Sequence, residues 1–514
     1  MDERAAVEFR NISVRFPGVL ANDSVSLTVK RGEIFALVGE NGAGKTTLMK
    51  VLYGMNRPTQ GEVFVFGSRL EKYDPAYSIS LGVGMVHQHF MLVPSFTVAQ
   101  NIVLGREPKK SGVFYDKRAA ERITHELIKA YGLEVDANAV VADLSVGAQQ
   151  RVEILKTLYR GADILVLDEP TAVLTPNETK EFFDVLRGIV SEKGVTVIII
   201  THKLNEVMEI SDRVGVMRAG KLVGVCNTNE VTSQQLASMM VGREVLLDAV
   251  ERSTTVGEPR VVIKDLNVYD DRGLHVVKGL SLSVRAGEIL GVAGVEGNGQ
   301  SELAEAITGL RKIASGVVSI NGVSVSGLGP GEIRALGVSH VPEDRLRTGV
   351  SAPASVADNL LAGKQRDNRF ARARIHRRSA SISRYVDEVK TQFDIRAAGS
   401  DVAAGSLSGG NIQKLVVARE FSFEHANVLV ICQPTRGVDI GAMEYIHSLI
   451  LAKRSDGCAI LLISADLDEL FRISDRIVTM YEGELTGEFV TGETNHYEVG
   501  AYMAGAIGGV NHDV

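Results

Sequence analysis

Short apolar runs of strand length alternate with helical segments along the whole chain. Residues 33–38, 163–167 and 195–200 each form such a run, bounded by polar or turn-forming residues. Residues 45–52 follow the first run and predict a helix. This alternation predicts α/β domains with mostly parallel sheets.

The pattern occurs twice. Residues 25–33, 39–48 and 162–171 return as residues 280–288, 294–303 and 426–435. The offset grows from 255 (294 − 39) to 264 (426 − 162), so the second half carries a few extra residues. We predict domain 1 at 5–244, a linker at 245–258, domain 2 at 259–505 and a flexible tail at 506–514.

Composition narrows the class of protein. A chain of 514 residues with 45% hydrophobic residues predicts at least two domains with sizeable cores. The net charge of −7 disfavours nucleic acid as a partner. The start lacks the apolar stretch of a signal peptide, and no apolar run has the length of a membrane span. The three cysteines lack metal-ligand spacing, and we expect free thiols.

A glycine-rich loop, GENGAGKTT at residues 39–47, stands between the first strand and helix. It fits G-x-x-x-x-G-K-[ST] with its strand and helix in place. The glycines allow backbone N–H groups to face phosphate oxygens, and the helix N-terminus favours the anion. Lys45 can reach the β- and γ-phosphates, and Thr46 can offer its hydroxyl to Mg²⁺. The alternative is a strand-to-helix turn without a ligand.

Two carboxylates end the run at 163–167. Asp168 is placed to hold Mg²⁺ directly or through a water, and Glu169 to polarise the attacking water as a general base. A helix-capping pair is the alternative for these two residues. The earlier segment LSVGAQQR at 144–151 is typical of a helix start capped by Ser145.

Together these motifs resemble the nucleotide-binding domain of an ABC ATPase. The order is phosphate loop, Gln88, LSVGA, Asp168-Glu169 and His202, and the second half repeats it around LSGGNIQK at 407–414. The resemblance covers residues 5–505. It implies two tandem domains, each with a RecA-like P-loop core, an antiparallel β part and a helical subdomain at 89–160 or 344–423. It also implies head-to-tail closure, with ATP between one phosphate loop and the opposite signature.

The resemblance assigns residues to the ATP site. It implies that Phe16 stacks on adenine, although a core or turn phenylalanine is the alternative, and that His202 contacts the γ-phosphate. The implied catalytic residues are Lys45, Gln88, Glu169 and His202. The implied Mg²⁺ ligands are Thr46, Gln88 and Asp168. The implied ATP contacts are Phe16, Gly39, Asn41, Gly42, Gly44, Lys45, Thr46 and Thr47, with Ser408, Gly409, Gly410, Asn411 and Asp439 from the second half.

The halves depart from the family pattern in opposite places. In the second half, Gln300, Glu343, Cys432, Gln433 and Ala465 replace Lys45, Gln88, Asp168, Glu169 and His202. In the first half the departures are Val146 and Ala148 in the signature and Thr175 in the D-loop. The intact parts converge on one hydrolytic site. The weakened parts form a degenerate site of Gly294, Gly299, Gln300, Ser301, Ser145 and Gly147, and whether it holds nucleotide stays open.

The tandem arrangement is similar to the fused ATPases of bacterial nucleoside and simple-sugar importers. Residues 86–92 (VHQHFML), 171–176 (TAVLTP) and 433–439 (QPTRGVD) favour the nucleoside type. This implies ATP hydrolysis at the cytoplasmic face of the membrane, with two permease subunits and an extracytoplasmic substrate-binding lipoprotein as partners. The alternatives are a sugar importer and a soluble tandem ABC protein that acts on ribosomes.

Two surface segments complete the predictions. The arginine-rich stretch 364–384 is interpreted as a solvated face, with anionic lipid and nucleic acid as alternatives. Apolar residues 90–92 predict either an interface with the permease or packing within the helical subdomain.

Overall fold

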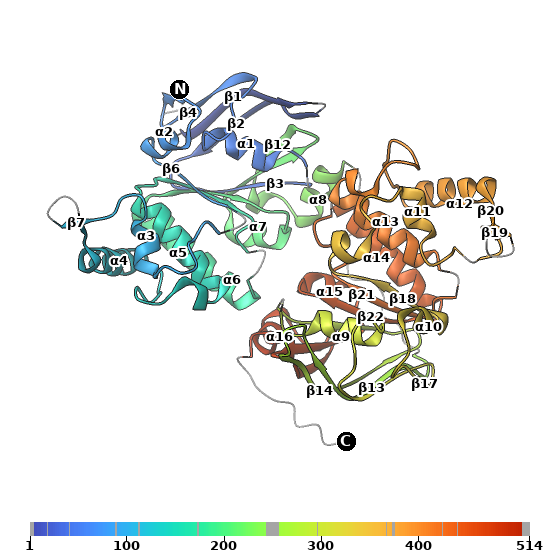
Figure 1. The fold of residues 1–514 in the computed structure, drawn as a ribbon. Helices are drawn as coiled ribbons and strands as arrows, with labels where there is room; N and C mark the ends of the chain where they lie inside the picture. Colours follow the sequence, from blue (N-terminus) through green and yellow to red (C-terminus); the bar gives the residue numbers. More distant parts are fainter. Residues whose placement is uncertain are drawn as a thin grey trace. The chain divides into compact units, whose positions relative to one another are not determined.

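A computed structural model describes most of the chain, which divides into two compact units, Met1–Leu246 and Leu247–Val514. The described residues are 5–17, 19–40, 42–87, 90–110, 114–171, 174–242, 256–295, 297–365, 367–372, 376–423, 425–438 and 440–505. The predicted tail 506–514 and most of the predicted linker 245–258 lie outside these ranges. Each unit is an α/β domain with its own sheets and core (Figure 1).

The larger sheet of the first unit is six-stranded, in the order β12-β11-β3-β10-β9-β6. Strands β11, β3, β10, β9 and β6 are parallel, and β12 is antiparallel to β11. The bounds are β3 (Ile34–Gly39), β6 (Val83–Val86), β9 (Ile164–Asp168), β10 (Thr196–Ile200), β11 (Arg213–Arg218) and β12 (Lys221–Asn227). The three strands predicted from the apolar runs are thereby confirmed to within one residue.

Strands β3, β6, β9 and β10 are buried along their whole length because both faces of the sheet are covered there. Phe35 and Leu37 of β3 pack on one side with α1 (Lys45–Leu52), whereas Ile34 packs on the other with α5 (Val146–Tyr159) and α6 (Pro176–Lys193). Figure 1 shows α1 between the parallel sheet and a second, antiparallel sheet of order β2-β1-β4-β5. Its strands are β1 (Ala5–Phe16), β2 (Val19–Lys30), β4 (Gln60–Val65) and β5 (Ser68–Arg69).

The remaining elements of the first unit include the helical part between β6 and β9. Helices α3 (Val98–Val103) and α4 (Lys117–Tyr131) pack with α5, and β7 (Lys109–Lys110) pairs with β8 (Phe114–Tyr115). The other elements are α2 (Pro75–Ser80), η1 (Val141–Asp143), α7 (Leu204–Ile210), η2 (Thr228–Glu230) and α8 (Ser233–Val241).

The second unit repeats this topology. Its sheets have the orders β18-β21-β22-β15-β23-β24 and β14-β13-β16-β17. The strands are β13 (Pro259–Tyr269), β14 (His275–Arg285), β15 (Ile289–Ala293), β16 (Ser315–Ile320), β17 (Val323–Ser324), β18 (Val338–Val341), β19 (Ala371–Arg372), β20 (His376–Arg377), β21 (Val428–Cys432), β22 (Ala459–Ser464), β23 (Arg476–Tyr481) and β24 (Glu484–Val490). The helices are α9 (Gln300–Ile307), α10 (Pro330–Ala335), η3 (Arg345–Gly349), α11 (Val356–Leu361), α12 (Ser379–Gln392), η4 (Ala404–Ser406), α13 (Gly409–Phe421), α14 (Ile440–Ser455), α15 (Leu467–Ile473) and α16 (His496–Met503).

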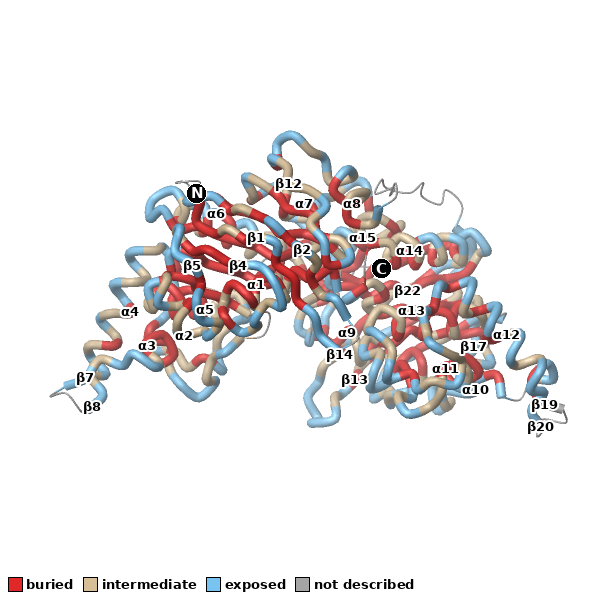
Figure 2. The backbone as a smooth tube through the Cα atoms, turned by 90° about the horizontal axis from the view of Figure 1, so that it is seen from above, coloured by how far each residue is buried: buried red, intermediate tan, exposed pale blue. Residues whose placement is uncertain are grey.

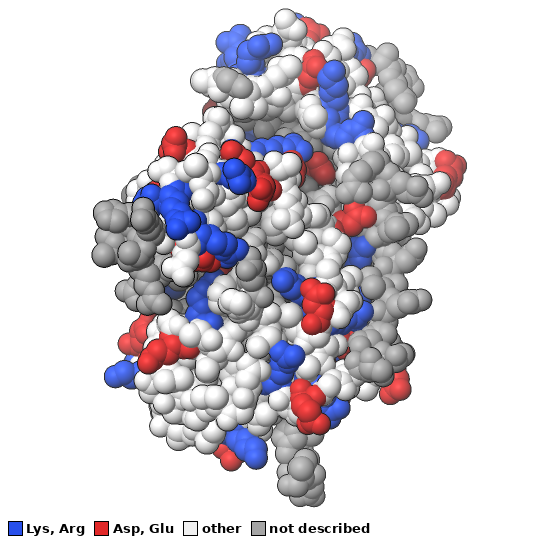
Figure 3. Space-filling view, turned by 90° about the vertical axis from the view of Figure 1, so that its right-hand side faces the viewer, with Lys and Arg blue, Asp and Glu red and all other residues white. Residues whose placement is uncertain are grey.

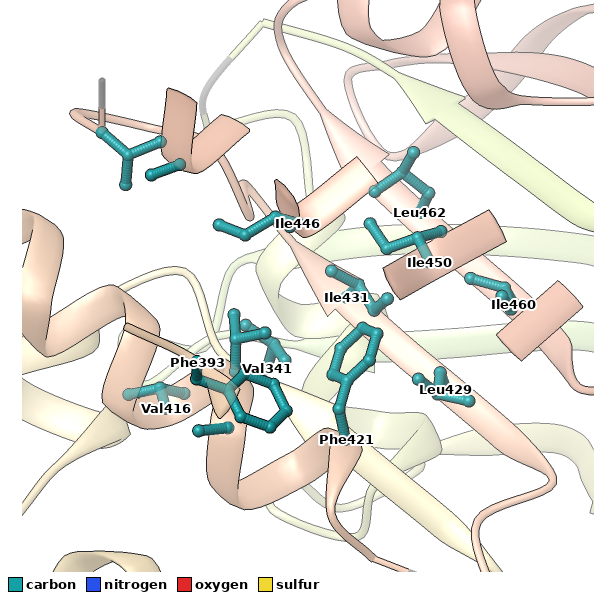
Figure 4. Packing of buried hydrophobic residues seen from close by; sticks show 14 of the residues in the cluster. Val341, Phe393, Val416, Phe421, Leu429, Ile431, Ile446, Ile450, Ile460 and Leu462 are labelled. Atoms are coloured by element: carbon teal, nitrogen blue, oxygen red, sulfur yellow. The ribbon is translucent and has the colours of Figure 1, made fainter. Parts of the chain in front are cut away.

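Figure 4 shows the core on one face of this second parallel sheet. Leu429 and Ile431 of β21 meet Phe421 of α13 and Ile450 of α14. The strands of the parallel sheets are the most continuously buried stretches, while α4 and α12 carry exposed faces (Figure 2). Two α/β domains of the same architecture, each with an antiparallel sheet and a helical part, confirm the predicted fold class.

Among the described residues, no helix combines the length and apolar character required to cross a membrane. Cys226 is half-buried, Cys432 and Cys458 are buried, and all three are free thiols.

Candidate nucleotide-binding site

The phosphate loop of the first unit begins at the end of β3 and ends at the first residue of α1. Gly44 has φ of +96°, and a Cβ built there would lie 2.3 Å from the carbonyl oxygen of Ala21 on β2. A side chain at this position would therefore clash with backbone as well as strain the turn. The Asn22 side chain, from the same strand, donates to the Gly44 carbonyl at 3.1 Å. Asn22 was missed at the sequence level because 22 residues separate it from its partner.

The Lys45 side chain folds back over this loop. Its Nζ donates to the carbonyl oxygens of Gly39 at 2.6 Å and Glu40 at 3.0 Å, and the residue is 6% exposed. Burial lowers the pKa of the Lys45 ammonium, which the nearby Glu169, Asp168 and Glu40 carboxylates partly offset. The ammonium group thus lies within the loop whose N–H groups would surround a phosphate.

Thr46 and Asp168 bring two side-chain oxygen atoms together. The Thr46 hydroxyl, at the start of α1, donates to Asp168 Oδ1 at 3.4 Å, and Asp168 is the last residue of β9. Asp168 is 7% exposed, and burial raises the pKa of its carboxyl. A hydroxyl and a carboxylate at the mouth of the loop are the hard oxygen donors that Mg²⁺ prefers, so these residues fit that ion.

Glu169 and His202 form a second polar pair. Glu169 has φ of +50°, its N–H donates to the Ile200 carbonyl at 2.8 Å, and Glu169 Oε1 lies 3.0 Å from His202 Nδ1. Burial raises the pKa of the Glu169 carboxyl, but the hydrogen bond to His202 and the nearby positive charges outweigh it, and the net pKa is lowered. The His202 side chain is 39% exposed. The pair therefore presents an ionised carboxylate, oriented by an imidazole, to an accessible surface.

The equivalent loop of the second unit has different chemistry. The Gln300 amide donates to the Val295 carbonyl at 3.0 Å and accepts from the Asn298 N–H at 3.1 Å, so it cross-links its own loop. Gly299 keeps the left-handed turn with φ of +99°, and a Cβ at Gly294 would lie 2.0 Å from the Gln300 amide nitrogen. The loop keeps its shape, but its lysine is absent.

The other departures of the second unit lie around this loop. The Ser301 hydroxyl donates to Glu343 Oε2 at 2.5 Å. Cys432 is buried at the end of β21, and burial raises the pKa of its thiol. Gln433 has φ of +47°, and its amide oxygen accepts from the Ala465 N–H at 3.4 Å. The backbone of the site is preserved while its ionisable groups differ.

The two signature segments begin helices. Ser145 caps α5, its hydroxyl accepting from the Ala148 N–H at 3.3 Å. Ser408 precedes α13, and the Asn411 side-chain amide donates to its hydroxyl at 2.9 Å. Helix α13 begins at Gly409, so Gly409, Gly410 and Asn411 form its first turn.

Other predicted site residues are placed as follows. Phe16 is 42% exposed at the end of β1, opposite Val19, so it is not a core residue. Gly147 lies in the first turn of α5, and Thr175 caps α6 in a capping box with Glu178. Gly42 is exposed in the loop, Thr47 is half-buried in α1, and Gly410 lies in open space at the start of α13. Asn41, Gln88 and Asp439 lie outside the described residues.

The segment after β6 borders a cavity of about 180 Å³ lined by residues that include Tyr53, His87, Met91, Glu153, Lys156 and Arg160. Met91 is 63% exposed, while its N–H donates to Glu153 and its carbonyl accepts from Lys156, each at 2.6 Å. Leu92 packs against the core of the helical part. Met91 is thus an exposed apolar residue whose backbone is hydrogen-bonded to Glu153 and Lys156. Leu92 agrees with the predicted alternative of packing within the helical subdomain.

The described basic side chains of residues 364–384 are partly engaged with the protein itself. Lys364 is buried and donates to the Tyr385 hydroxyl, and Arg377 pairs with Asp358 at 2.7 Å. Arg366 and Arg374 lie outside the described residues. On the face drawn in Figure 3, the coloured basic and acidic side chains are interspersed.

Comparison with known proteins agrees with this geometry. The family model described as ABC transporter matches residues 22–172 and 277–436. The chain is 45% identical over 509 residues to the nucleoside import ATP-binding protein NupA of Lactococcus lactis, covering 98% of this chain and 99% of that protein. It is 45% identical over 500 residues to the guanosine import ATP-binding protein NupO of Bacillus subtilis, covering 97% of each.

Two further proteins are similar to this chain. The glucose import ATP-binding protein TsgD13 of Haloferax volcanii is 43% identical over 534 residues, covering 98% of this chain and 96% of that protein. The solved complex of archaeal ribosomal stalk protein aP1 with ribosome recycling factor aABCE1 matches with a TM-score of 0.63 and 18% identity, covering 93% of this chain and 90% of that one. At that identity the structural likeness shows the fold alone. The chain therefore belongs to the ABC transporter family, in which it is an ATP-binding protein and an ATPase.

Proposed function

We propose that this chain hydrolyses ATP at the loop of its first half and thereby drives the import of nucleosides. The observation that carries the proposal is the 45% identity, over nearly the whole chain, to two relatives named for nucleoside and guanosine import. The site geometry supports the hydrolytic half of the proposal, because the lysine, the hydroxyl–carboxylate pair and the oriented glutamate all lie at one loop.

In this mechanism Lys45 binds the β- and γ-phosphates, exchanging its two loop carbonyls for phosphate oxygens. Thr46 and Asp168 would hold Mg²⁺, whose bound charge would neutralise phosphate oxygens as the bond breaks. Glu169 accepts a proton from the attacking water as a general base. His202 orients the Glu169 carboxylate and donates toward the γ-phosphate. By the family resemblance, Gln88 would supply a further oxygen ligand to Mg²⁺.

The second half contributes its signature to this same ATP. Ser408, Gly409 and Gly410 retain the family pattern, whereas the first half has Val146 and Ala148 in its own signature. The start of α13 offers backbone N–H groups and the positive end of a helix to the γ-phosphate. This sorting of intact parts supports one hydrolytic and one degenerate site.

We further propose that the chain docks on the cytoplasmic face of the membrane, on two permease subunits that receive cargo from an extracytoplasmic binding protein. The exposed Met91 beside the cavity after β6 is the docking point, because an apolar side chain on a rigidly held backbone suits a protein interface. Met91→Glu should reduce co-purification of the polytopic partners from detergent-solubilised membranes. Phe114→Glu, at a 73% exposed position of β8, is the matched control and should leave recovery unchanged. Recovery of ribosomal subunits instead of membrane proteins would contradict the proposal.

The cargo is tested by transport in membrane vesicles with the complete complex. We expect ATP-dependent uptake of labelled nucleosides. Unlabelled guanosine should reduce this uptake by competition, and unlabelled glucose should not. The sugar alternative has a specific observation in its favour, the 43% identity to a glucose importer's ATPase. Uptake of sugars with no uptake of nucleosides would select it.

A further inference from the structure

A short hairpin of β7 and β8 precedes α4 in the helical part of the first unit. The strands are antiparallel, with Lys109 opposite Tyr115 and Lys110 opposite Phe114. Because opposite residues of an antiparallel pair share a face, each face of the hairpin carries one lysine and one aromatic ring. All four side chains are exposed, Phe114 at 73% and Tyr115 at 41%. Figures 1 and 2 both place the hairpin at the outer end of its unit, beyond α4.

Hydrogen bonds hold the base of this hairpin. The Asp116 N–H donates to the Pro108 carbonyl at 2.9 Å, and the Asp116 carboxylate accepts from the Ala119 N–H at 3.0 Å. The first bond closes the hairpin, and the second caps α4. The Glu107 carboxylate accepts from the Gly105 N–H at 2.8 Å. The base is therefore fixed to the helix, and both acidic side chains of the segment are engaged with backbone N–H groups.

The segment is basic within an acidic chain. Residues 106–118 contain five basic and two acidic side chains, a net charge of +3, whereas the whole chain carries −7. Among the described residues, no ion pair engages Lys109 or Lys110. Anionic lipid headgroups attract lysines, and aromatic rings concentrate at the boundary between headgroups and acyl chains. Exposed cations beside exposed rings are therefore complementary to an anionic lipid surface.

The equivalent hairpin of the second unit, β19 with β20, directs its aromatic ring inward. Phe370, directly before β19, is 4% exposed, and its ring centroid lies 4.9 Å from that of Tyr385 on α12. Ala371 is 3% exposed, and Arg377 of β20 pairs with Asp358 at 2.7 Å. The outward pairing of aromatic rings with lysines thus distinguishes the hairpin of the first half.

We propose that the β7–β8 hairpin binds an anionic lipid surface, with Lys109 and Lys110 on the headgroups and Phe114 inserted among them. The flexible lysine stems let the ammonium groups stay at the headgroups while the ring goes deeper. This contact goes beyond the proposed function, because it requires neither the permease nor a particular cargo. Detergent replaces lipid, so it also leaves Phe114→Glu without effect on recovery of the permease.

The test uses the absence of tryptophan from the chain. Phe114→Trp places a single indole on the hairpin of the full chain. The protein is mixed with vesicles of phosphatidylglycerol and phosphatidylcholine, or of phosphatidylcholine alone. With the anionic vesicles only, we expect the emission to move to shorter wavelength and to be quenched by brominated acyl chains. Tyr497→Trp, at a 47% exposed position of α16, is the matched control and should show neither change.

The lysines are tested in the Phe114→Trp protein. Changing Lys109 and Lys110 to Gln should weaken partition into the anionic vesicles by about fivefold for each lysine, and added salt should weaken it further. Lys193→Gln, at the exposed end of α6, is the matched control and should leave partition unchanged. An indole unshifted by anionic vesicles, equal partition into neutral vesicles, or a shift with RNA alone would overturn the proposal. None of these results bears on hydrolysis or cargo, which phosphate release and uptake measure separately.

Discussion

Replacing Glu169 with Gln removes the proposed general base with little structural change. The second half shows that glutamine fits this backbone, because Gln433 has φ of +47° where Glu169 has φ of +50°. Their N–H groups donate to the carbonyls of Ile463 and Ile200, both at 2.8 Å. The amide oxygen of the new glutamine can still face His202. We therefore expect the free energy of unfolding to change little and the loss to report on chemistry.

The expected loss in kcat is roughly 10²- to 10⁴-fold, the contribution of a positioned general base. This corresponds to about 3–5 kcal/mol of activation free energy. ATP affinity should be retained, because Lys45, Thr46 and Asp168 are untouched. The net lowered pKa of Glu169 means that the carboxylate is ionised at neutral pH. Wild-type turnover should therefore fall only as the pH drops through that folded-state pKa, below the ordinary glutamate range, and the stability contributed by the carboxylate is lost in the same direction.

The assay is phosphate release from the reconstituted complex, with Gln433→Ala as the matched change in the second half. Gln433→Ala should leave turnover within about twofold of wild type, because the Gln433 amide cannot accept a proton and so is not a general base. Turnover of Glu169→Gln within about twofold of wild type would refute the assignment of the base. Equal losses from the two changes would refute the one-site mechanism.

Three further predictions test the site and the fold. Lys45→Ala should weaken ATP binding and turnover together, whereas Gln300→Ala, which alters only an amide closed on its own loop, should be nearly silent in phosphate release. Ser408→Arg should abolish hydrolysis and transport by blocking the working signature, while Ser145→Arg should retain substantial hydrolysis; the reverse result in phosphate release would contradict the crossed arrangement. Glu420→Ala should destabilise the second unit by about 3–5 kcal/mol in urea unfolding, because it removes a buried carboxylate that the partly buried guanidinium groups of Arg334 and Arg419 contact at 2.7 Å.

The sequence predicts the local elements of the site but not the direction in which its side chains point. The strand, loop and helix around residue 44 follow from apolar runs and glycine spacing, and the structure has them within one residue. The reach of Lys45 to the carbonyls of its own loop, and of Asn22 to Gly44, depends on tertiary distances that no spacing rule gives. The replacement of Gln88 by Glu343 is visible in the repeat. The hydrogen bond from Ser301 to Glu343 depends on how the strands are arranged in space, which the sequence alone does not show.

The start of α13 shows another limit. A glycine pair disfavours a helix interior, so the pattern places the helix after it. In the structure these glycines form the first turn, where four N–H groups lack intrahelical partners in any case and the cost of glycine is small. Leu92 likewise packs against the core of the helical part. The sequence leaves this open, because the residues around Leu92 come from distant segments of the chain.

The left-handed residue at the end of β9 and β21 also sets how each half can be stabilised. A non-glycine residue in this conformation carries strain of about 1–3 kcal/mol. Glycine would relieve part of it at either position. At Gln433 glycine would remove no catalytic group, so Gln433→Gly can raise the thermal stability of the second half without loss of turnover. At Glu169 the same substitution would remove the proposed general base, so there the strained backbone cannot be relieved without loss of activity.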